Sequence, residues 1–169
     1  MAITSTDLVS RRLVTRLIFA LTGAAALSRP FGVLAAPAKD RVTVWKTPNC
    51  GCCKEWVSHL RSNGFEVVTI DVNDTAPMRQ KLGLAEKLGS CHTGLLGTYV
   101  LEGHVPAKEM RRLLREKPQA LGLAVPGMPT GSPGMEMGST RDAYDVLLIL
   151  KDGSSSVYQS YSKKPSSNA

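Results

Sequence analysis

The chain has 169 residues and a formal net charge of +7. This length accommodates one compact domain with processing segments, and not two domains. Hydrophobic residues make up 43% and charged residues 21% of the sequence, which excludes an extensively disordered protein. The basic residues are scattered apart from a local group over 108–117, which is expected to be a solvated helix face, and they form no stripe with interleaved aromatic residues. The composition therefore argues against binding to DNA or any other nucleic acid.

The N-terminus, residues 1–38, predicts a signal peptide for export. Three arginines precede an apolar run of 11 residues, 17–27. A membrane span needs about 20 residues, but the shorter run is typical of the hydrophobic region of a secretory signal. Cleavage is expected after Ala35 or Ala38. The alternative is an uncleaved membrane anchor, and both interpretations place the domain in the periplasm of a bacterium.

The export route stays open at this point. Ser10-Arg11-Arg12 begins like a twin-arginine signal, but Thr15 stands where a second apolar residue is usual. The sequence therefore favours neither the general secretory route nor the twin-arginine route.

The mature part predicts a strand, a helix and a second strand. Polar and apolar residues alternate over 41–46, which is a strand pattern. After a turn, apolar positions recur at helical spacing from about Cys52 to Ser62, and Asn63-Gly64 is a C-cap signal. Residues 65–72 are largely apolar, as expected for a buried parallel strand. Together they predict a βαβ unit with a right-handed crossover.

The rest of the chain predicts alternating elements and one long irregular segment. In chain order we expect a weaker helix over 78–88, a break over 89–94, a strand over 98–101, a helix over 106–117, an irregular segment over 120–140, and a hairpin of strands 142–150 and 156–161.

A first strand that leads directly into a cysteine-bearing helix is the thioredoxin-like arrangement. We therefore predict an α/β fold with a central mixed sheet, flanking helices and a C-terminal β-hairpin. The domain is expected over residues 39–161, followed by a flexible polar tail over 162–169.

All four cysteines lie between Cys50 and Cys91, and three of them stand in the segment Cys50-Gly51-Cys52-Cys53. A purely structural disulfide is disfavoured because a bond between neighbouring Cys52 and Cys53 is strained. Cys50 and Cys53 have the C-x-x-C spacing of a thiol–disulfide oxidoreductase at a helix start, where the thiolate is stabilised. However, that chemistry needs no third thiol, and no proline stands near Cys91, where a thioredoxin has its cis-proline. The chain is not a standard thioredoxin.

Metal binding is the interpretation we favour. In a thioredoxin-like fold, the loop before the third strand lies against the start of the first helix, so Cys91 would face the other three cysteines. Such soft thiolates select Cu(I), Zn²⁺ or iron–sulfur clusters. Adjacent Cys52 and Cys53 suit thiolate-bridged copper better than a single tetrahedral zinc ion. The predicted ligand set is Cys50, Cys52, Cys53 and Cys91, with several Cu(I) ions per chain.

Methionines and histidines extend the candidate site. Met128, Met135 and Met137 lie in a Gly- and Pro-rich segment that cannot be helical, and thioethers suit Cu(I); packing as loop anchors is the alternative. Met78 and Met110 are assigned to the core.

His92, next to Cys91, and His104, after the third strand, are candidate ligands. His59, on the first helix, is expected to be a surface residue.

Several separated motifs together resemble the CopG-type family of periplasmic metal-binding proteins from copper-resistance systems. They are the segments 47–53 (TPNCGCC), 90–93 (SCHT), 102–106 (EGHVP), 123–129 (LAVPGMP) and 131–136 (GSPGME). The resemblance spans about residues 42–161.

The resemblance implies a thioredoxin-like fold, a cysteine-bridged multinuclear copper site and a role in copper resistance, with interconversion of Cu(I) and Cu(II) as a further activity. Copper ions, and other periplasmic copper-handling proteins, are the partners it implies. A periplasmic oxidoreductase that uses Cys50 and Cys53 remains the alternative.

Overall fold

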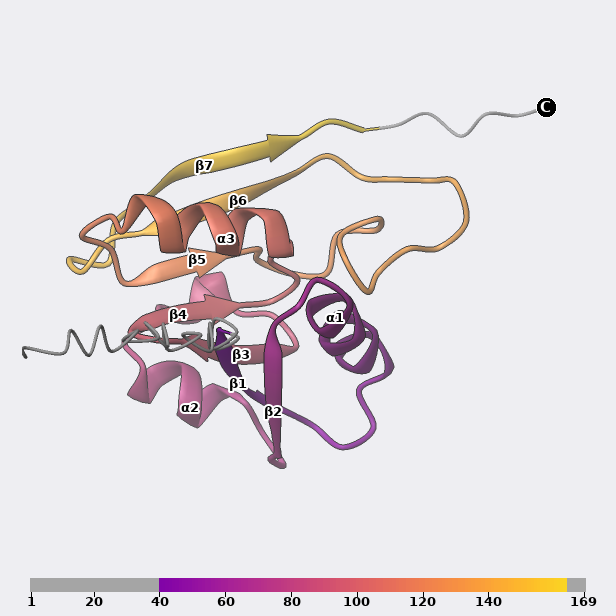
Figure 1. The fold of residues 1–169 in the computed structure, drawn as a ribbon, viewed down its shortest axis with the longest axis horizontal. Helices are drawn as coiled ribbons and strands as arrows, with labels where there is room; N and C mark the ends of the chain where they lie inside the picture. Colours follow the sequence, from indigo (N-terminus) through magenta and orange to yellow (C-terminus); the bar gives the residue numbers. More distant parts are fainter. Residues whose placement is uncertain (1–39, 164–169) are drawn as a thin grey trace, which may run out of the picture. The chain divides into compact units, whose positions relative to one another are not determined.

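The computed structural model describes residues 40–163, which form a seven-stranded mixed sheet with helices on both faces (Figure 1). The predicted signal peptide and the end of the predicted tail lie outside the described residues. The strands are β1 (Arg41–Lys46), β2 (Glu66–Asp71), β3 (His92–Leu96), β4 (Tyr99–Glu102), β5 (Gly122–Ala124), β6 (Tyr144–Ile149) and β7 (Ser155–Tyr161). The helices are α1 (Gly51–Ser62), α2 (Ala76–Lys81) and α3 (Ala107–Glu116), with a short 3₁₀ helix η1 (Glu86–Leu88).

The strand order is β2-β1-β3-β4-β5-β6-β7. β1 and β2 are parallel, β3 is antiparallel to β1, and β4 is antiparallel to β3. β5 is parallel to β4, and β6 and β7 form an antiparallel hairpin. The predicted α/β class, mixed sheet and C-terminal hairpin are therefore confirmed, and the first four strands are compatible with the thioredoxin-like arrangement.

The two faces of the sheet bury different clusters. The larger cluster joins the sheet to α1 and α3 through side chains such as Trp56, Leu60 and Met110. The smaller cluster includes Leu84 and Leu88, around η1. Neighbouring residues of a strand point to opposite faces, so in β4 Leu101 joins the larger cluster and Val100 the smaller one.

The predicted helix over 78–88 is wrong in length and in its buried side. Gly83 has a φ of +80° and separates α2 from η1. Met78, which we expected in the core, is only half-buried, whereas Arg79 is 8% exposed. The helix turns its arginine inward because a carboxylate lies there to pair with it. Met110 does lie in the core, with no exposed surface.

Two strands, β3 and β5, were not expected from the sequence. β3 is almost entirely buried, so it lacks the alternation of polar and apolar residues that is typical of a strand with one solvent-exposed face. β5 has three residues and lies in the segment expected to be irregular. Its Gly122 packs so closely on β4 that a Cβ atom there would collide with the backbone of Val100.

Within residues 40–163, the helices are all too short or too polar to cross a membrane.

Candidate metal centre

The start of α1 holds three of the four cysteines. Cys50 is the N-cap residue, and its sulfur accepts a hydrogen bond from the backbone N–H of Cys53 at 3.2 Å. Cys53 is fully buried, and Cys50 and Cys52 are half-buried. The unpaired N–H groups and the dipole of the helix favour negative charge on sulfur at this end.

Cys91 comes from the other side of the site, just before β3. Its Sγ lies 3.7 Å from Sγ of Cys52, and Sγ of Cys52 lies 3.5 Å from Sγ of Cys50. The four sulfur atoms all lie within 4.8 Å of one another. The structure therefore brings together the four cysteines that the sequence singled out.

Two of these sulfurs are bonded to each other. Cys50 and Cys53 form a disulfide, whereas Cys52 and Cys91 are free thiols. The bonded pair is the C-x-x-C pair of the oxidoreductase alternative. A site with four thiolates requires the reduction of this bond.

His104 presents one ring nitrogen to Cys91. Its Nδ1 lies 2.8 Å from the carbonyl oxygen of Pro133, and because a carbonyl only accepts, Nδ1 carries the hydrogen. In the neutral ring, Nε2 then keeps its lone pair, and it lies 3.1 Å from Sγ of Cys91. Metal-binding histidines are commonly oriented in this way by a backbone carbonyl on the far nitrogen.

His92 lies behind Cys91 and is fully buried. Its Nδ1 is 3.3 Å from Sγ of Cys91, while its Nε2 has no hydrogen-bond partner. The ring packs against Trp56 at an angle of 35°, with 4.3 Å between centroids, and meets His104 edge-on at 4.9 Å. Cys91, His92 and His104 thus form a second group of candidate ligands that shares Cys91 with the first.

Burial dominates the electrostatics of this centre. It raises the pKa of Cys91 to about 12, and the neighbouring Cys52 adds to the shift. It lowers the pKa of His92 to about 3, with a further contribution from His104, and it also lowers the pKa of His104. At neutral pH without metal, Cys91 is therefore a thiol and both imidazoles are neutral.

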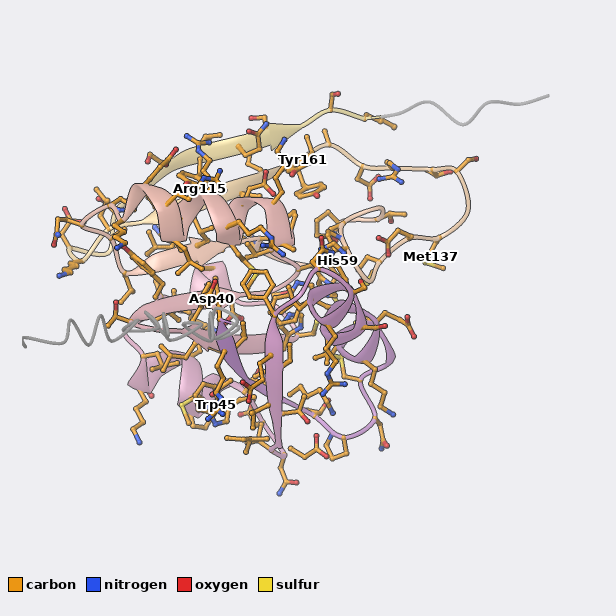
Figure 2. All side chains as sticks on the ribbon, viewed as in Figure 1. Asp40, Trp45, His59, Arg115, Met137 and Tyr161 are labelled. Atoms are coloured by element: carbon orange, nitrogen blue, oxygen red, sulfur yellow. A yellow bond between two sulfur atoms is a disulfide. The ribbon has the colours of Figure 1, made fainter. Side chains whose placement is uncertain are left out.

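The methionines have unequal positions on the segment between β5 and β6. Gly134, at a φ of +83°, packs on α1 so closely that a Cβ atom would lie 2.6 Å from the Trp56 nitrogen and 2.8 Å from the Cys52 oxygen. Met135 follows it and is half-buried. Met128 is 55% exposed and Met137 is 70% exposed. Figure 2 shows Met137 on this segment. The segment therefore packs against α1, but two of its three thioethers are exposed to solvent.

His59 is not the free surface residue that we expected. It is half-buried on α1 (Figure 2), and its Nε2 accepts a hydrogen bond from the backbone N–H of Ala107 at 3.2 Å. His59 therefore ties α1 to the first turn of α3, and burial lowers its pKa.

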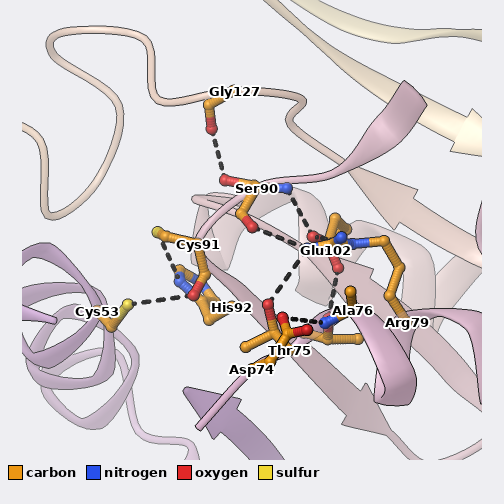
Figure 3. Close-up of polar contacts among 11 residues, drawn as sticks. Cys53, Asp74, Thr75, Ala76, Arg79, Ser90, Cys91, His92, Glu102 and Gly127 are labelled. Atoms are coloured by element: carbon orange, nitrogen blue, oxygen red, sulfur yellow. Dashed lines mark hydrogen bonds and ion pairs between the residues drawn. The ribbon is translucent and has the colours of Figure 1, made fainter. Parts of the chain in front are cut away.

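Sequence reasoning missed a buried ion pair beside the thiols. Nε of Arg79, on α2, lies 2.8 Å from Oε1 of Glu102, at the end of β4 (Figure 3). Glu102 has no exposed side-chain surface. Burial raises the pKa of this carboxyl, and hydrogen bonds from Thr93 and Ser90 together with the Arg79 charge oppose that shift. The only sign in the sequence was a glutamate that follows the apolar run Tyr99-Val100-Leu101.

The fold and the donors define an α/β protein with a candidate soft-metal centre, and comparisons with known proteins agree with this class. Two solved structures of the copper resistance protein CopG, form 2 and form 1, are each 44% identical to this chain with a TM-score of 0.71. The matches cover 73% and 74% of this chain and 99% of the CopG chain. The chain belongs to the CopG family of copper resistance proteins.

A family model described as a protein of unknown function, DUF411, matches residues 88–135. These residues include Cys91, both buried histidines and Met135. Comparison with curated proteins gives no match.

Proposed function

We propose that this protein binds copper in the periplasm as part of copper resistance, holding several Cu(I) ions per chain in a thiolate-bridged site. The observation that carries the proposal is the convergence of the sulfurs of Cys50, Cys52, Cys53 and Cys91 within 4.8 Å of one another. Membership of a copper resistance family supports copper as the metal.

The donor set fits Cu(I) better than a hard cation. Both groups of candidate ligands consist of sulfur and imidazole, without a carboxylate. Soft thiolates and thioethers select Cu(I), while Mg²⁺ and Ca²⁺ prefer oxygen. Nε2 of His104 and Nδ1 of His92 both face Sγ of Cys91, at 3.1 and 3.3 Å. A metal ion bound to this sulfur would therefore have two imidazole nitrogens within reach.

Loading requires a change in the thiols. The Cys50–Cys53 disulfide must take up two electrons and two protons to give two thiols. Each cysteine that then binds copper releases its proton. Because the pKa of Cys91 is raised to about 12, copper and not the solvent must displace that proton at neutral pH.

A titration of the reduced protein tests the proposal. The protein is reduced and held anaerobically, and Cu(I) is added against a competing chromogenic Cu(I) chelator. We expect more than one copper per chain and no displacement by excess Zn²⁺. Saturation at one copper per chain would exclude the multinuclear site, and failure to compete with the chelator would exclude the copper function.

The proposal includes a redox activity of the bound copper, cycling between Cu(I) and Cu(II). The measurement is a redox titration of the copper-loaded protein with mediators. A reversible one-electron response per redox-active copper is the expected result, and loss of copper on oxidation would contradict this part of the proposal.

Export is the last part of the proposal. Processing is expected to leave an N-terminus between Ala36 and Lys39 on protein recovered from the periplasm. N-terminal sequencing of the native protein tests this, and a cytosolic protein that retains Met1 would contradict it.

The Cys50–Cys53 disulfide favours a second candidate function, thiol–disulfide exchange. Cys50 at the N-cap of α1 is placed as a thioredoxin nucleophile would be. Against it, the free thiol of Cys52 lies 3.5 Å from Sγ of Cys50, where it would compete as a nucleophile. We expect negligible turnover in an insulin-reduction assay. Robust turnover that Cys50→Ser abolishes would establish the oxidoreductase instead.

A further inference from the structure

The residues on both sides of Cys91 are tied to a single buried carboxylate. Oε1 of Glu102 accepts a hydrogen bond from the backbone N–H of Ser90 at 2.7 Å. Oε2 of Glu102 accepts one from the hydroxyl of Thr93 at 2.7 Å. Cys91 and His92 lie between these two anchor points in the chain, and Figure 3 shows Ser90 beside Glu102. The short segment that carries the thiol is therefore fixed at each end by one side chain.

Arg79 completes the arrangement from a different element. Its Nε lies 2.8 Å from Oε1 of Glu102, and its Nη2 donates to the carbonyl oxygen of Ser90 at 2.9 Å and to Thr75 Oγ1 at 3.3 Å. Both backbone polar groups of Ser90 are thus bound by the ion pair. Gly103, next to Glu102, has a φ of +70°, and a Cβ atom there would lie 2.7 Å from Cβ of Ser90, so only glycine permits this close approach.

We propose that Arg79 and Glu102 are positioning residues of the metal centre, which hold the Cys91 sulfur at its distance from Cys52 and His104. The expected effect on copper affinity rests on the proposed function. The positioning of Cys91 does not depend on it, because the hydrogen bonds are present without copper. Neither residue belongs to the candidate ligand groups.

The energetics of buried charge support a role in geometry. A buried ion pair gives little net stability compared with apolar side chains of the same volume, because removing two charges from water is costly. An apolar pair at these positions could fill the same space between α2 and β4. It could not bind the N–H and the carbonyl of Ser90 or the hydroxyl of Thr93, so Cys91 would lose its fixed position.

The first test measures copper affinity with isosteric variants. Thr93→Val keeps the shape but removes the hydroxyl that binds Glu102, and Thr93→Ser restores that hydroxyl. Removal of a hydrogen-bond partner outside the ligands of a metal site typically costs about 10- to 100-fold in affinity. We expect a loss of this size in Thr93→Val and Glu102→Gln, and near wild-type affinity in Thr93→Ser. Ile149→Val, a core truncation in the smaller cluster, is the control for a general loss of stability.

The second test needs no copper. Diamide oxidises the free thiols of Cys52 and Cys91, taking up two electrons and two protons as the new disulfide forms. Because the two sulfurs lie 3.7 Å apart, wild-type protein should form this bond rapidly. Peptide mapping under non-reducing conditions measures its rate. We expect slower formation in Thr93→Val and Glu102→Gln, and an unchanged rate in Thr93→Ser and Ile149→Val.

The two tests separate the two hypotheses. If wild-type protein binds no Cu(I) but the bond forms slowly in the variants, the copper function is wrong and the positioning role stands. If wild-type protein binds Cu(I) and Thr93→Val retains both affinity and rate, the positioning role is wrong. Should Glu102→Gln fail to fold, the comparison of Thr93→Val with Thr93→Ser still decides. If Ile149→Val loses as much copper affinity and disulfide-formation rate as Thr93→Val, the proposal is also overturned.

Discussion

Two regions supply the candidate sulfur ligands, and the two differ in regularity and burial. The cysteines lie at the ends of regular elements, where helix α1 begins and strand β3 begins, and their sulfurs converge in a half-buried or buried setting. The methionines lie on the irregular segment 125–143. That segment contacts the site through Pro133 and Gly134, while two of its three thioethers are in solvent.

The difference indicates a division of roles between charged and neutral sulfur donors. Thiolates compensate the positive charge of Cu(I), and the four cysteine sulfurs lie at one place. Thioethers carry no charge, and a ligand that is 70% exposed contributes little to a buried site. We therefore expect the cysteine region to determine how much copper is held. The loop matters mainly through the Pro133 carbonyl, which orients His104.

The largest expected effect is that of Cys91→Ser. If each sulfur bridges more than one copper ion, removal of one bridge should lower the copper content by more than one equivalent. Anaerobic loading followed by elemental analysis measures this, with Met135→Leu as the matched sulfur variant on the loop. Equal losses in the two variants would show that the two regions do not differ.

The second effect concerns the reactivity of the thiol itself. With its pKa raised to about 12, Cys91 stays protonated at pH 8, and only the thiolate reacts with iodoacetamide. We expect alkylation on the order of a hundredfold slower than for an unperturbed thiol, since the higher nucleophilicity of a basic thiolate offsets part of the lower thiolate fraction. The rate should rise steadily as the pH is raised from 8 to 11. A rate that levels off near pH 9 would contradict the prediction.

The third effect tests the link between the regions. His104→Asn removes the imidazole that Pro133 orients towards Cys91, and we expect Cu(I) affinity to fall by about tenfold. His59→Gln is the control, because His59 is a histidine that contacts α3 and not the thiols. A similar fall in both variants would assign the loss to packing.

The smallest effects are expected for the exposed thioethers. Met128→Leu and Met137→Leu should leave the copper content unchanged and the free energy of unfolding within about 0.5 kcal/mol of wild type. Chelator competition and urea unfolding measure the two quantities. A loss of a full copper equivalent in either variant would show that the loop supplies a ligand to the metal centre.

The sequence predicts the elements whose apolar residues have a period. Strand β1, helices α1 and α3, and the β6–β7 hairpin lie within a few residues of the predicted positions. β3 has no such period because both its faces are buried, and β5 is too short to show one. The buried side of helix α2 was predicted wrongly because Arg79 faces inward. A single sequence does not reveal that Arg79 pairs with Glu102 in the interior.

For the candidate metal centre, the spacing of neighbouring cysteines predicted the thiol site. Contacts between residues far apart in the chain were not predictable. The cluster Cys50-Gly51-Cys52-Cys53 pointed to a thiol site, and the expected fold placed Cys91 opposite. The spacing of Cys50 and Cys53 pointed to their disulfide only through the alternative function, thiol–disulfide exchange. The hydrogen bonds that fix Ser90 and His104 join residues 12 and 29 positions apart. Such contacts depend on the tertiary fold and leave no pattern along the chain.

The contact between Trp56 and His92 gives the protein an intrinsic fluorescence signal. The centroids of the two rings lie 4.3 Å apart and Trp56 is fully buried, so its emission reports on the immediate surroundings of the donor cluster. Of the two tryptophans, Trp45 lies on strand β1 and is partly exposed. Copper ions quench nearby indole fluorescence, so the blue-shifted component from Trp56 should fall on loading while that from Trp45 changes less.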